Sequence, residues 1–223
     1  MRIKGSLICI TGIDGVGKTT LAKNLVKMMT QDGVRFEYVY GRLKPFILRP
    51  FMILGRKILL KGKNIFSDYT NYKNTKKYLS KNYPILAWIY QALLLFDYFI
   101  QIFLNIKIRL LLGKNIICDR YIYDVVITDL SVDFNYSEKD VRKVLHYILL
   151  LLPKPDVVFL IDLPEEIAYR RKNDIPSIDY LRDRRRTYLS LSKEFGMVIL
   201  DGSQSLEELR QTAKEVIKRR YFE

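Results

Sequence analysis

An eight-residue stretch near the amino terminus has the composition of a loop that binds phosphate. Residues 12–19 read GIDGVGKT, which fits the pattern G-x-x-x-x-G-K-[ST] without a mismatch. Glycines let backbone N–H groups crowd around phosphate oxygens, and the following helix adds its positive dipole end. Lys18 can reach the β- and γ-phosphates of a nucleotide, and Thr19 can offer its hydroxyl to Mg²⁺. We expect a nucleotide phosphate site formed by Gly12, Asp14, Gly15, Val16, Gly17, Lys18, Thr19 and Thr20.

A second polar turn follows a short apolar run about a hundred residues later. Asp119 and Arg120 come directly after residues 115–118, which read NIIC. An acid at the end of such a strand is typical of a residue that holds Mg²⁺ close to the hydroxyl of a phosphate loop. Arginine can clamp a phosphate with a planar fork that lysine cannot copy. An ordinary surface Asp–Arg pair is the alternative interpretation.

Residues 170–186 form a strongly basic stretch that could act as a lid. Phosphoryl transfer spreads negative charge over the equatorial oxygens, which mobile arginines can stabilise. We expect one or two of these residues to be catalytic and the rest to form a solvated helix face. The basic residues are Arg170, Arg171, Lys172, Arg182, Arg184, Arg185 and Arg186.

Short apolar runs alternate with segments of helical period along most of the chain. We expect strands near residues 7–10, 36–40, 115–118, 157–161 and 197–200, with helices between them. This order predicts a three-layer α/β fold with a five-stranded parallel sheet covered by helices, the fold of P-loop NTPases. Ligands of such sheets bind beyond the carboxyl ends of the strands, so the two polar turns should meet there. Without a linker or repeat, residues 1–223 are interpreted as one domain.

Two further segments allow more than one interpretation. Residues 85–112 are apolar enough to suggest a membrane span, but Gln91, Asp97 and Gln101 interrupt them. We therefore expect a long buried core helix and no membrane association. Residues 41–83 form a basic excursion, whose Tyr- and Lys-rich part at 64–83 could stack on nucleic acid. A solvated basic loop is the simpler expectation, and a nucleic-acid partner is not expected.

Composition narrows the class of protein further. The formal net charge is +14, which suits polyanionic ligands, although it also fits nucleic acid or an anionic membrane. Cys9 and Cys118 lie in apolar runs and are expected to be buried thiols in a reducing compartment. With His146 as the single histidine, a Ser-His-Asp triad or a histidine metal cluster is not expected. The first strand begins so near Met1 that we expect no signal peptide and a cytoplasmic protein.

Together these segments resemble thymidylate kinase and its relatives among the P-loop nucleoside monophosphate kinases. The resemblance extends over nearly the whole chain. It rests on residues 12–20 (GIDGVGKTT), 119–121 (DRY), 164–170 (PEEIAYR), 185–189 (RRTYL) and 201–208 (DGSQSLEE). It implies an ATP-dependent, Mg²⁺-requiring enzyme of nucleotide biosynthesis. It also implies a homodimer, for which the apolar segment 85–112 could supply the contact.

The resemblance also implies roles for particular residues. The acid within the loop, Asp14, should lie near the acceptor sugar, and Arg120 should contact phosphate between donor and acceptor. Because Val16 stands where some relatives have a basic residue, the lid should supply a catalytic arginine, first Arg170 and second Arg171. The implied catalytic set is Lys18, Asp14, Arg120 and Arg170, and the implied metal ligands are Thr19 and Asp119.

The acceptor side departs from the family pattern. Arg42 stands in for the arginine of an Arg-Glu-Pro-Gly turn without its acid, and Asp97 is present without the arginine that should follow it. After Tyr121, the polar residues that help to recognise thymine are absent. The implied acceptor set is Asp14, Arg42, Asp97, Arg120 and Tyr121.

Three functions therefore remain open at this point. The first is transfer of phosphate from ATP to dTMP, giving ADP and dTDP. The second is a kinase of the same fold with a different phosphorylated acceptor, which the eroded acceptor motifs favour. The third is a non-catalytic ATP-binding or nucleic-acid-associated module, against which the presence of Asp14, Asp119 and Arg120 argues.

Overall fold

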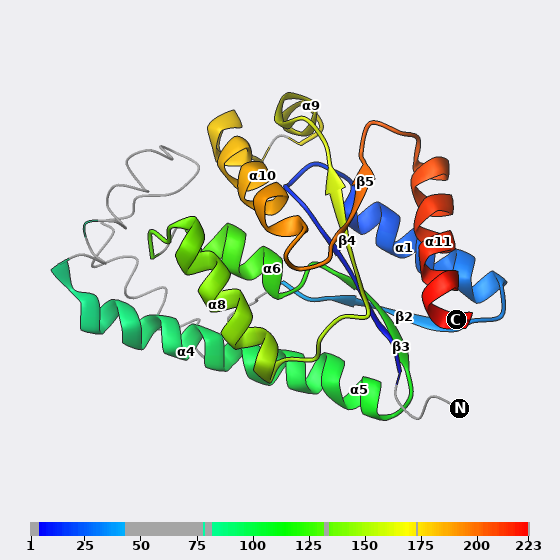
Figure 1. The fold of residues 1–223 in the computed structure, drawn as a ribbon, viewed down its shortest axis with the longest axis horizontal. Helices are drawn as coiled ribbons and strands as arrows, with labels where there is room; N and C mark the ends of the chain where they lie inside the picture. The colour runs from blue at the N-terminus through cyan, green and yellow to red at the C-terminus, as the bar shows by residue number, and fades with distance from the viewer. Residues whose placement is uncertain (1–4, 43–77, 79–81, 132–133, 173, 223) are drawn as a thin grey trace.

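One parallel sheet runs through the centre of the molecule (Figure 1). The computed structural model describes residues 5–42, 78, 82–131, 134–172 and 174–222. Within these residues the sheet has five strands in the order β2-β3-β1-β4-β5, and every neighbouring pair is parallel. The strands are β1 (Leu7–Thr11), β2 (Phe36–Tyr40), β3 (Asn115–Asp119), β4 (Val157–Asp162) and β5 (Val198–Asp201). The predicted five-stranded α/β fold is confirmed.

Helices cover both faces of this sheet. On one face α1 packs beside α11, and on the other lie α5, α6 and α8, while α9 and α10 lie near the carboxyl end of β4 (Figure 1). The helical segments are α1 (Lys18–Gln31), α4 (Pro84–Ile102), η1 (Phe103–Lys107), α5 (Ile108–Leu111), α6 (Ile122–Asp124), η2 (Val125–Leu130), α8 (Glu138–Leu151), α9 (Glu165–Arg170), α10 (Ile178–Ser192) and α11 (Leu206–Phe222). The segments η1 and η2 are π-helical.

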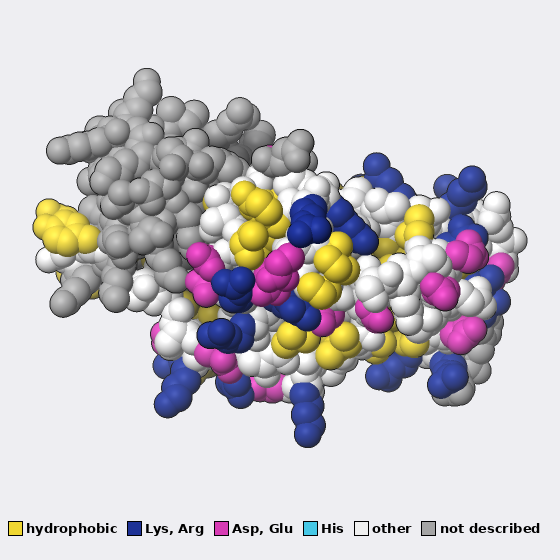
Figure 2. All heavy atoms as spheres, turned by 90° about the horizontal axis from the view of Figure 1, so that it is seen from above, with side chains coloured by type: hydrophobic (Ala, Val, Ile, Leu, Met, Phe, Trp, Pro, Cys, Tyr) yellow, Lys and Arg dark blue, Asp and Glu magenta, His cyan; other side chains and the backbone are white. Residues whose placement is uncertain are grey.

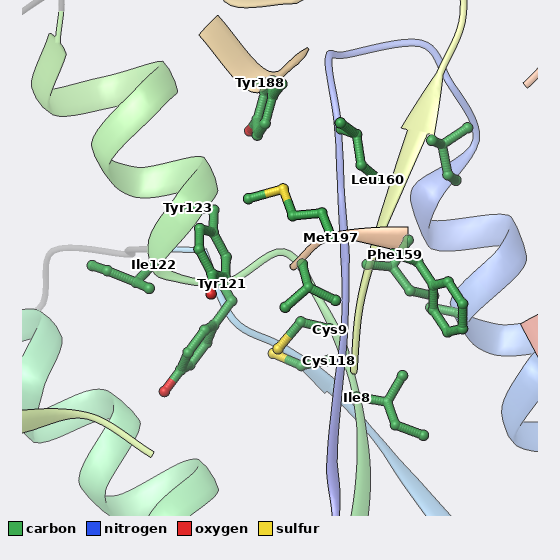
Figure 3. Packing of buried hydrophobic residues seen from close by; sticks show 14 of the residues in the cluster. Ile8, Cys9, Cys118, Tyr121, Ile122, Tyr123, Phe159, Leu160, Tyr188 and Met197 are labelled. Carbon is green, nitrogen blue, oxygen red and sulfur yellow. The ribbon is translucent and has the colours of Figure 1, made fainter. Parts of the chain in front are cut away.

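The central strands are apolar because helices bury both of their faces. Every residue of β1 is buried, and so are all residues of β3 except Asn115. Cys9 and Cys118 are partners in the register of these two strands, and both are buried free thiols, as predicted (Figure 3). The buried centre of the sheet thus leads directly to the phosphate loop after β1 and to the Asp119–Arg120 turn after β3.

The long apolar helix differs from its prediction. Helices α4, η1 and α5 run continuously from Pro84 to Leu111, but only 22% of the most apolar window of this span is buried. Its buried stripe consists of Leu94, Asp97, Tyr98, Ile102, Ile106 and Leu110. The prediction of a buried core helix is therefore wrong for most of its surface, because the helix lies in the outer layer and only one face meets the protein.

The opposite face of this helix is apolar and exposed. We call it the α4 apolar face, and it consists of Ile85, Trp88, Ile89, Leu93, Phe96, Leu104, Ile108 and Leu111. By length and composition alone, the span Pro84–Leu111 would also be sufficient to cross a membrane. Most of the basic excursion predicted at 41–83, including most of its Tyr- and Lys-rich part, lies outside the described residues.

Candidate active site

The phosphate loop joins β1 to α1 as the motif requires. Gly17 caps α1 with a left-handed backbone (φ 93°), a conformation that favours glycine. Lys18 donates from Nζ to the carbonyl oxygens of Gly12 and Ile13, each across 2.7 Å, so its side chain folds back over the loop. The lysine is only 4% exposed. Burial, assisted by the nearby charge of Arg120, lowers the pKa of Lys18 to about 8.

Asp119 lies at the end of β3, beside the start of α1. Its Oδ2 accepts hydrogen bonds from the Thr19 hydroxyl at 2.6 Å and from the Tyr38 hydroxyl at 2.9 Å. Its Oδ1 is buried and has no hydrogen-bond partner among the described residues. A buried carboxylate oxygen without a partner, next to a hydroxyl and a phosphate loop, fits a hard cation that is completed by phosphate oxygens and water. Thr19 and Asp119 therefore suit Mg²⁺.

Asp14 and Arg120 meet at the mouth of the loop. Arg120 donates from Nη2 to Asp14 Oδ1 across 2.5 Å, and its own backbone is left-handed (φ 70°), which is uncommon for a residue with a side chain. Burial opposes ionisation of Asp14, but the charges of Lys18 and Arg120 hold its pKa well below the ordinary value. The structure therefore brings together Asp14, Lys18 and Arg120, three of the four residues expected to be catalytic.

Arg42, which follows β2, reaches the same region. It donates from Nη2 to Asp129 Oδ1 at 2.7 Å and from Nε to Asp129 Oδ2 at 3.3 Å. Although burial opposes the charge, Asp129, and more weakly Asp14, raise the pKa of Arg42 above its ordinary value. Asp129 lies in η2 and was given no role from the sequence.

Two residues expected near the acceptor are buried elsewhere. Asp97 is 2% exposed in the buried stripe of α4 and accepts a hydrogen bond from Gln101. The ring of Tyr121 points away from the end of the sheet where the loop lies (Figure 3), and its hydroxyl donates to the Pro153 carbonyl at 2.9 Å. Both side chains are therefore enclosed by protein.

The basic stretch at 170–186 contains arginines of three kinds, which are paired, buried or exposed. Arg185 forms ion pairs with Asp162 and Glu165, and Arg182 pairs with Glu165, so these arginines tie α10 to α9 and to the end of β4. Arg184 is buried. Arg170 and Arg171 are exposed at the end of α9. Seen from the carboxyl edge of the sheet, basic and acidic side chains alternate over the centre of this surface (Figure 2).

Helix α9 also touches the loop directly. A Cβ placed on Gly15 would lie 2.2 Å from the carbonyl oxygen of Ala168, and Gly15 has a φ of +90°. Glycine is needed here both for the backbone conformation and for the close approach of the two segments. The loop and the helix that carries Arg170 are therefore in contact.

Asp124 is a buried acid that was not predicted from the sequence. It bonds to the end of β1, where the phosphate loop begins, and to Tyr121 after the Asp119–Arg120 turn. Asp124 is fully buried and accepts hydrogen bonds from the Thr11 hydroxyl at 2.8 Å, the Tyr188 hydroxyl at 3.1 Å and the Tyr121 N–H at 3.1 Å. Burial raises the pKa of this carboxyl. The signal in the sequence was an acid within the apolar run 122–127. Its position joins β1, α6 and α10.

A phosphate loop and an Asp–Arg turn at the carboxyl edge of a parallel sheet define a P-loop phosphotransferase. The family model for thymidylate kinase matches residues 71–213, more than half of the chain. A probable thymidylate kinase 1 of Saccharolobus solfataricus is 31% identical over 223 residues, covering 97% of this chain and 98% of that protein. A probable thymidylate kinase of Archaeoglobus fulgidus is 26% identical, covering 95% and 94%.

The solved thymidylate kinase of Candida albicans has the same fold, with a TM-score of 0.61 and 18% identity, covering 98% of this chain and 93% of that structure. The chain belongs to the thymidylate kinase family. It is therefore a nucleoside monophosphate kinase, as the sequence predicts.

Proposed function

We propose that this enzyme transfers the γ-phosphoryl group of ATP to dTMP, giving dTDP and ADP. Membership of the thymidylate kinase family supports this acceptor. The observation that carries the proposal is the meeting of Lys18 and Asp119 with the Asp14–Arg120 pair at one sheet edge. Such a site has cations for the phosphates and an acid close to where an acceptor sugar would lie.

Catalysis here consists of alignment and charge neutralisation. The phosphate of the acceptor is already a nucleophile, so no strong base is required. Lys18 would bind the β- and γ-phosphates. Arg120 would exchange its hydrogen bond to Asp14 for phosphate oxygens between donor and acceptor. Arg170 would approach the transferring group from α9, because it lies two residues beyond Ala168, where α9 contacts the loop at Gly15.

We further propose that the enzyme uses Mg²⁺, held by Thr19 and Asp119. The partnerless, buried Oδ1 of Asp119 supports this. When bound, the ion would neutralise charge on the phosphate oxygens that Lys18 also binds. No group of three or more His, Cys, Asp or Glu side chains suited to a metal occurs within the described ranges, which agrees with a site completed by nucleotide and water.

A different phosphorylated acceptor is the second candidate. Asp97 and Tyr121 are both buried, which gives a substrate little access to them, and Arg42 is paired with Asp129. This observation favours an acceptor other than dTMP while leaving the donor side unchanged.

We also propose a cytoplasmic homodimer packed through the α4 apolar face. This face is long, continuous and exposed, and large exposed apolar surfaces usually mark an interface. The other helix face carries Asp97 and Tyr98, which are buried, so the helix is attached to the enzyme along one side and presents only the α4 apolar face to a partner.

The test is ADP release with ATP and Mg²⁺ against dTMP, dUMP, the other nucleoside monophosphates and no acceptor. The Lys18→Ala variant provides the blank. Strong release with dTMP supports thymidylate as the acceptor. ATP binding without dTMP-dependent release would refute that acceptor, and the monophosphate that supports turnover would replace it.

A further inference from the structure

The backbone at Gly41, just before Arg42, packs closely against the Asp119–Arg120 turn. A Cβ on Gly41 would lie 2.4 Å from the carbonyl oxygen of Arg120. The Gly41 N–H donates to the Asp119 carbonyl at 3.0 Å, and its own carbonyl accepts from the Tyr98 hydroxyl at 2.9 Å. The end of β2 therefore lies against the Asp119–Arg120 turn. Arg42 follows directly, and its charge opposes that of Arg120.

The segment that carries Asp129 is fixed as well. The π-helix η2 is buried along most of its length, and Thr128 within it is only 6% exposed. Arg184 donates to the Thr128 carbonyl at 3.1 Å and to the Tyr180 carbonyl at 2.8 Å, which ties η2 to α10. π-Helical turns interrupt regular carbonyl pairing and are frequent at functional sites. Asp129 is thus held at a defined position opposite Arg42.

The contact between Arg42 and Asp129 is a two-bond fork. It engages Nε and Nη2 of the guanidinium, and both side chains are 29% exposed. Exposed ion pairs with one contact contribute little, but a bidentate pair also fixes the direction of the guanidinium. This fork uses Nε and Nη2, so within the described residues Nη1 of Arg42 can still donate a hydrogen bond to another group. Asp129 thus holds Arg42, whereas Arg120 pairs with Asp14 and has Asp124 Oδ1 3.9 Å from its Nη1.

We propose that Asp129 is a positioning residue for the phosphorylated acceptor. It holds Arg42 beside Arg120, so that the two guanidiniums bind the acceptor's phosphate together. Asp129 acts through Arg42 and does not touch the substrate. Two adjacent guanidiniums would otherwise separate, and a phosphate dianion bound between them would remove their repulsion. This inference rests on the proposed kinase activity and adds to it a residue that sets acceptor affinity.

A double-mutant cycle in steady-state kinetics tests the proposal. ADP release is measured for the wild type, Asp129→Asn, Arg42→Ala and the double variant, with the acceptor and ATP varied separately. We expect Asp129→Asn to raise KM for the acceptor about tenfold and to change kcat less than about twofold, because it removes a binding contact and no reacting group. KM for ATP should stay unchanged. In the Arg42→Ala background, Asp129→Asn should have no further effect.

The matched control is Glu37→Gln at the opposite end of β2. Glu37 is 25% exposed and pairs with Arg109 and Lys114, so it resembles Asp129 in burial and partners. Glu37→Gln should leave both KM values unchanged, and its thermal midpoint shows what losing such a pair does to stability alone. An equal rise in acceptor KM with Glu37→Gln would mean that the effect is structural and would overturn the proposal.

The remaining outcomes also decide the question. Additive effects in the double variant would mean that Asp129 acts independently of Arg42. A lowered acceptor KM in Asp129→Asn would mean that the carboxylate competes with the substrate for Arg42. Either result overturns the positioning role while leaving the kinase activity in place. If the wild type releases no ADP with any monophosphate, the proposed function fails, and the inference that rests on it fails with it.

Discussion

The hydroxyl of Thr19 donates to the carboxylate of Asp119 across 2.6 Å, although the two residues are 100 positions apart in the chain. The sheet order explains the contact, because β1 and β3 are neighbours and Ile10 is the register partner of Asp119. The phosphate loop leaves β1 just beyond this point. The acid and the hydroxyl therefore meet at the one place where strand ends, loop and helix start converge.

Asp119→Asn should lower kcat by about 100-fold or more, because it removes the negative charge that would hold the metal. It should also raise the Mg²⁺ concentration needed for half-maximal rate. The measurement is a Mg²⁺ titration of ADP release at saturating nucleotide. Tyr38→Phe is the matched control, since it removes only a hydroxyl bonded to the same carboxylate. A half-maximal Mg²⁺ concentration identical to that of the wild type in Asp119→Asn would count against a metal at this carboxylate.

ATP affinity should depend on the protonation of Lys18. Burial holds the pKa of Lys18 at about 8, and bound phosphates favour the ammonium form and raise that pKa. The protonated lysine is lost from the unliganded enzyme as pH rises through this value. ATP should therefore bind more weakly and with proton uptake between about pH 8 and pH 10.

Calorimetry in two buffers of different ionisation enthalpy measures both the affinity and the proton uptake. Lys18→Arg is the comparison, because its guanidinium stays protonated over this range. If the Kd of wild-type enzyme for ATP does not change between about pH 7 and pH 9.5, the pKa of Lys18 does not control binding.

Gly15→Ala should impair ATP binding and lower the thermal midpoint. The new Cβ would lie 2.2 Å from the Ala168 carbonyl, so the loop and α9 would have to move apart. Gly33→Ala is the control, with a similar φ of +83° and no atom within 4 Å. Gly33→Ala should lower the free energy of unfolding by only about 1 kcal/mol, through backbone strain, and should leave ATP affinity unchanged. Equal effects of both substitutions on ATP affinity would show that the contact with α9 is unimportant.

The sequence was sufficient for the sheet and for the donor side of the site. Buried parallel strands are continuous apolar runs, and a phosphate loop has a local motif, so both can be recognised without tertiary information. The helix at 85–112 was misjudged because it is apolar on nearly all sides, and its period could not show which face meets the protein. Asp129 and Asp124 were missed because their partners lie far along the chain. No local pattern predicts such a pairing.

The arginines of the basic stretch differ in a way that composition could not show. Arg182 and Arg185 are held by carboxylates, whereas Arg170 is exposed at the end of α9. Arg170→Ala should lower kcat by about 100-fold without changing the thermal midpoint, because a lid arginine stabilises charge only during transfer. The measurement is kcat together with thermal unfolding, and Lys172→Ala is the control. Loss of kcat in Arg171→Ala, with Arg170→Ala unaffected, would assign the role to the neighbouring arginine.

The α4 apolar face should hold two copies together. The variant with both Trp88→Glu and Leu104→Glu places charges at two positions that are 69% and 55% exposed. Burying those charges in an interface is costly, so a dimer should become a monomer while the fold remains intact. Sedimentation velocity measures the change.

Ile199→Glu is the control, since Ile199 is 50% exposed on β5, away from this face. It should leave the dimer unchanged. A wild-type enzyme that sediments as a monomer would rule out the interface. If that monomer also co-sediments with lipid vesicles, and the double variant does not, the α4 apolar face binds a membrane surface instead.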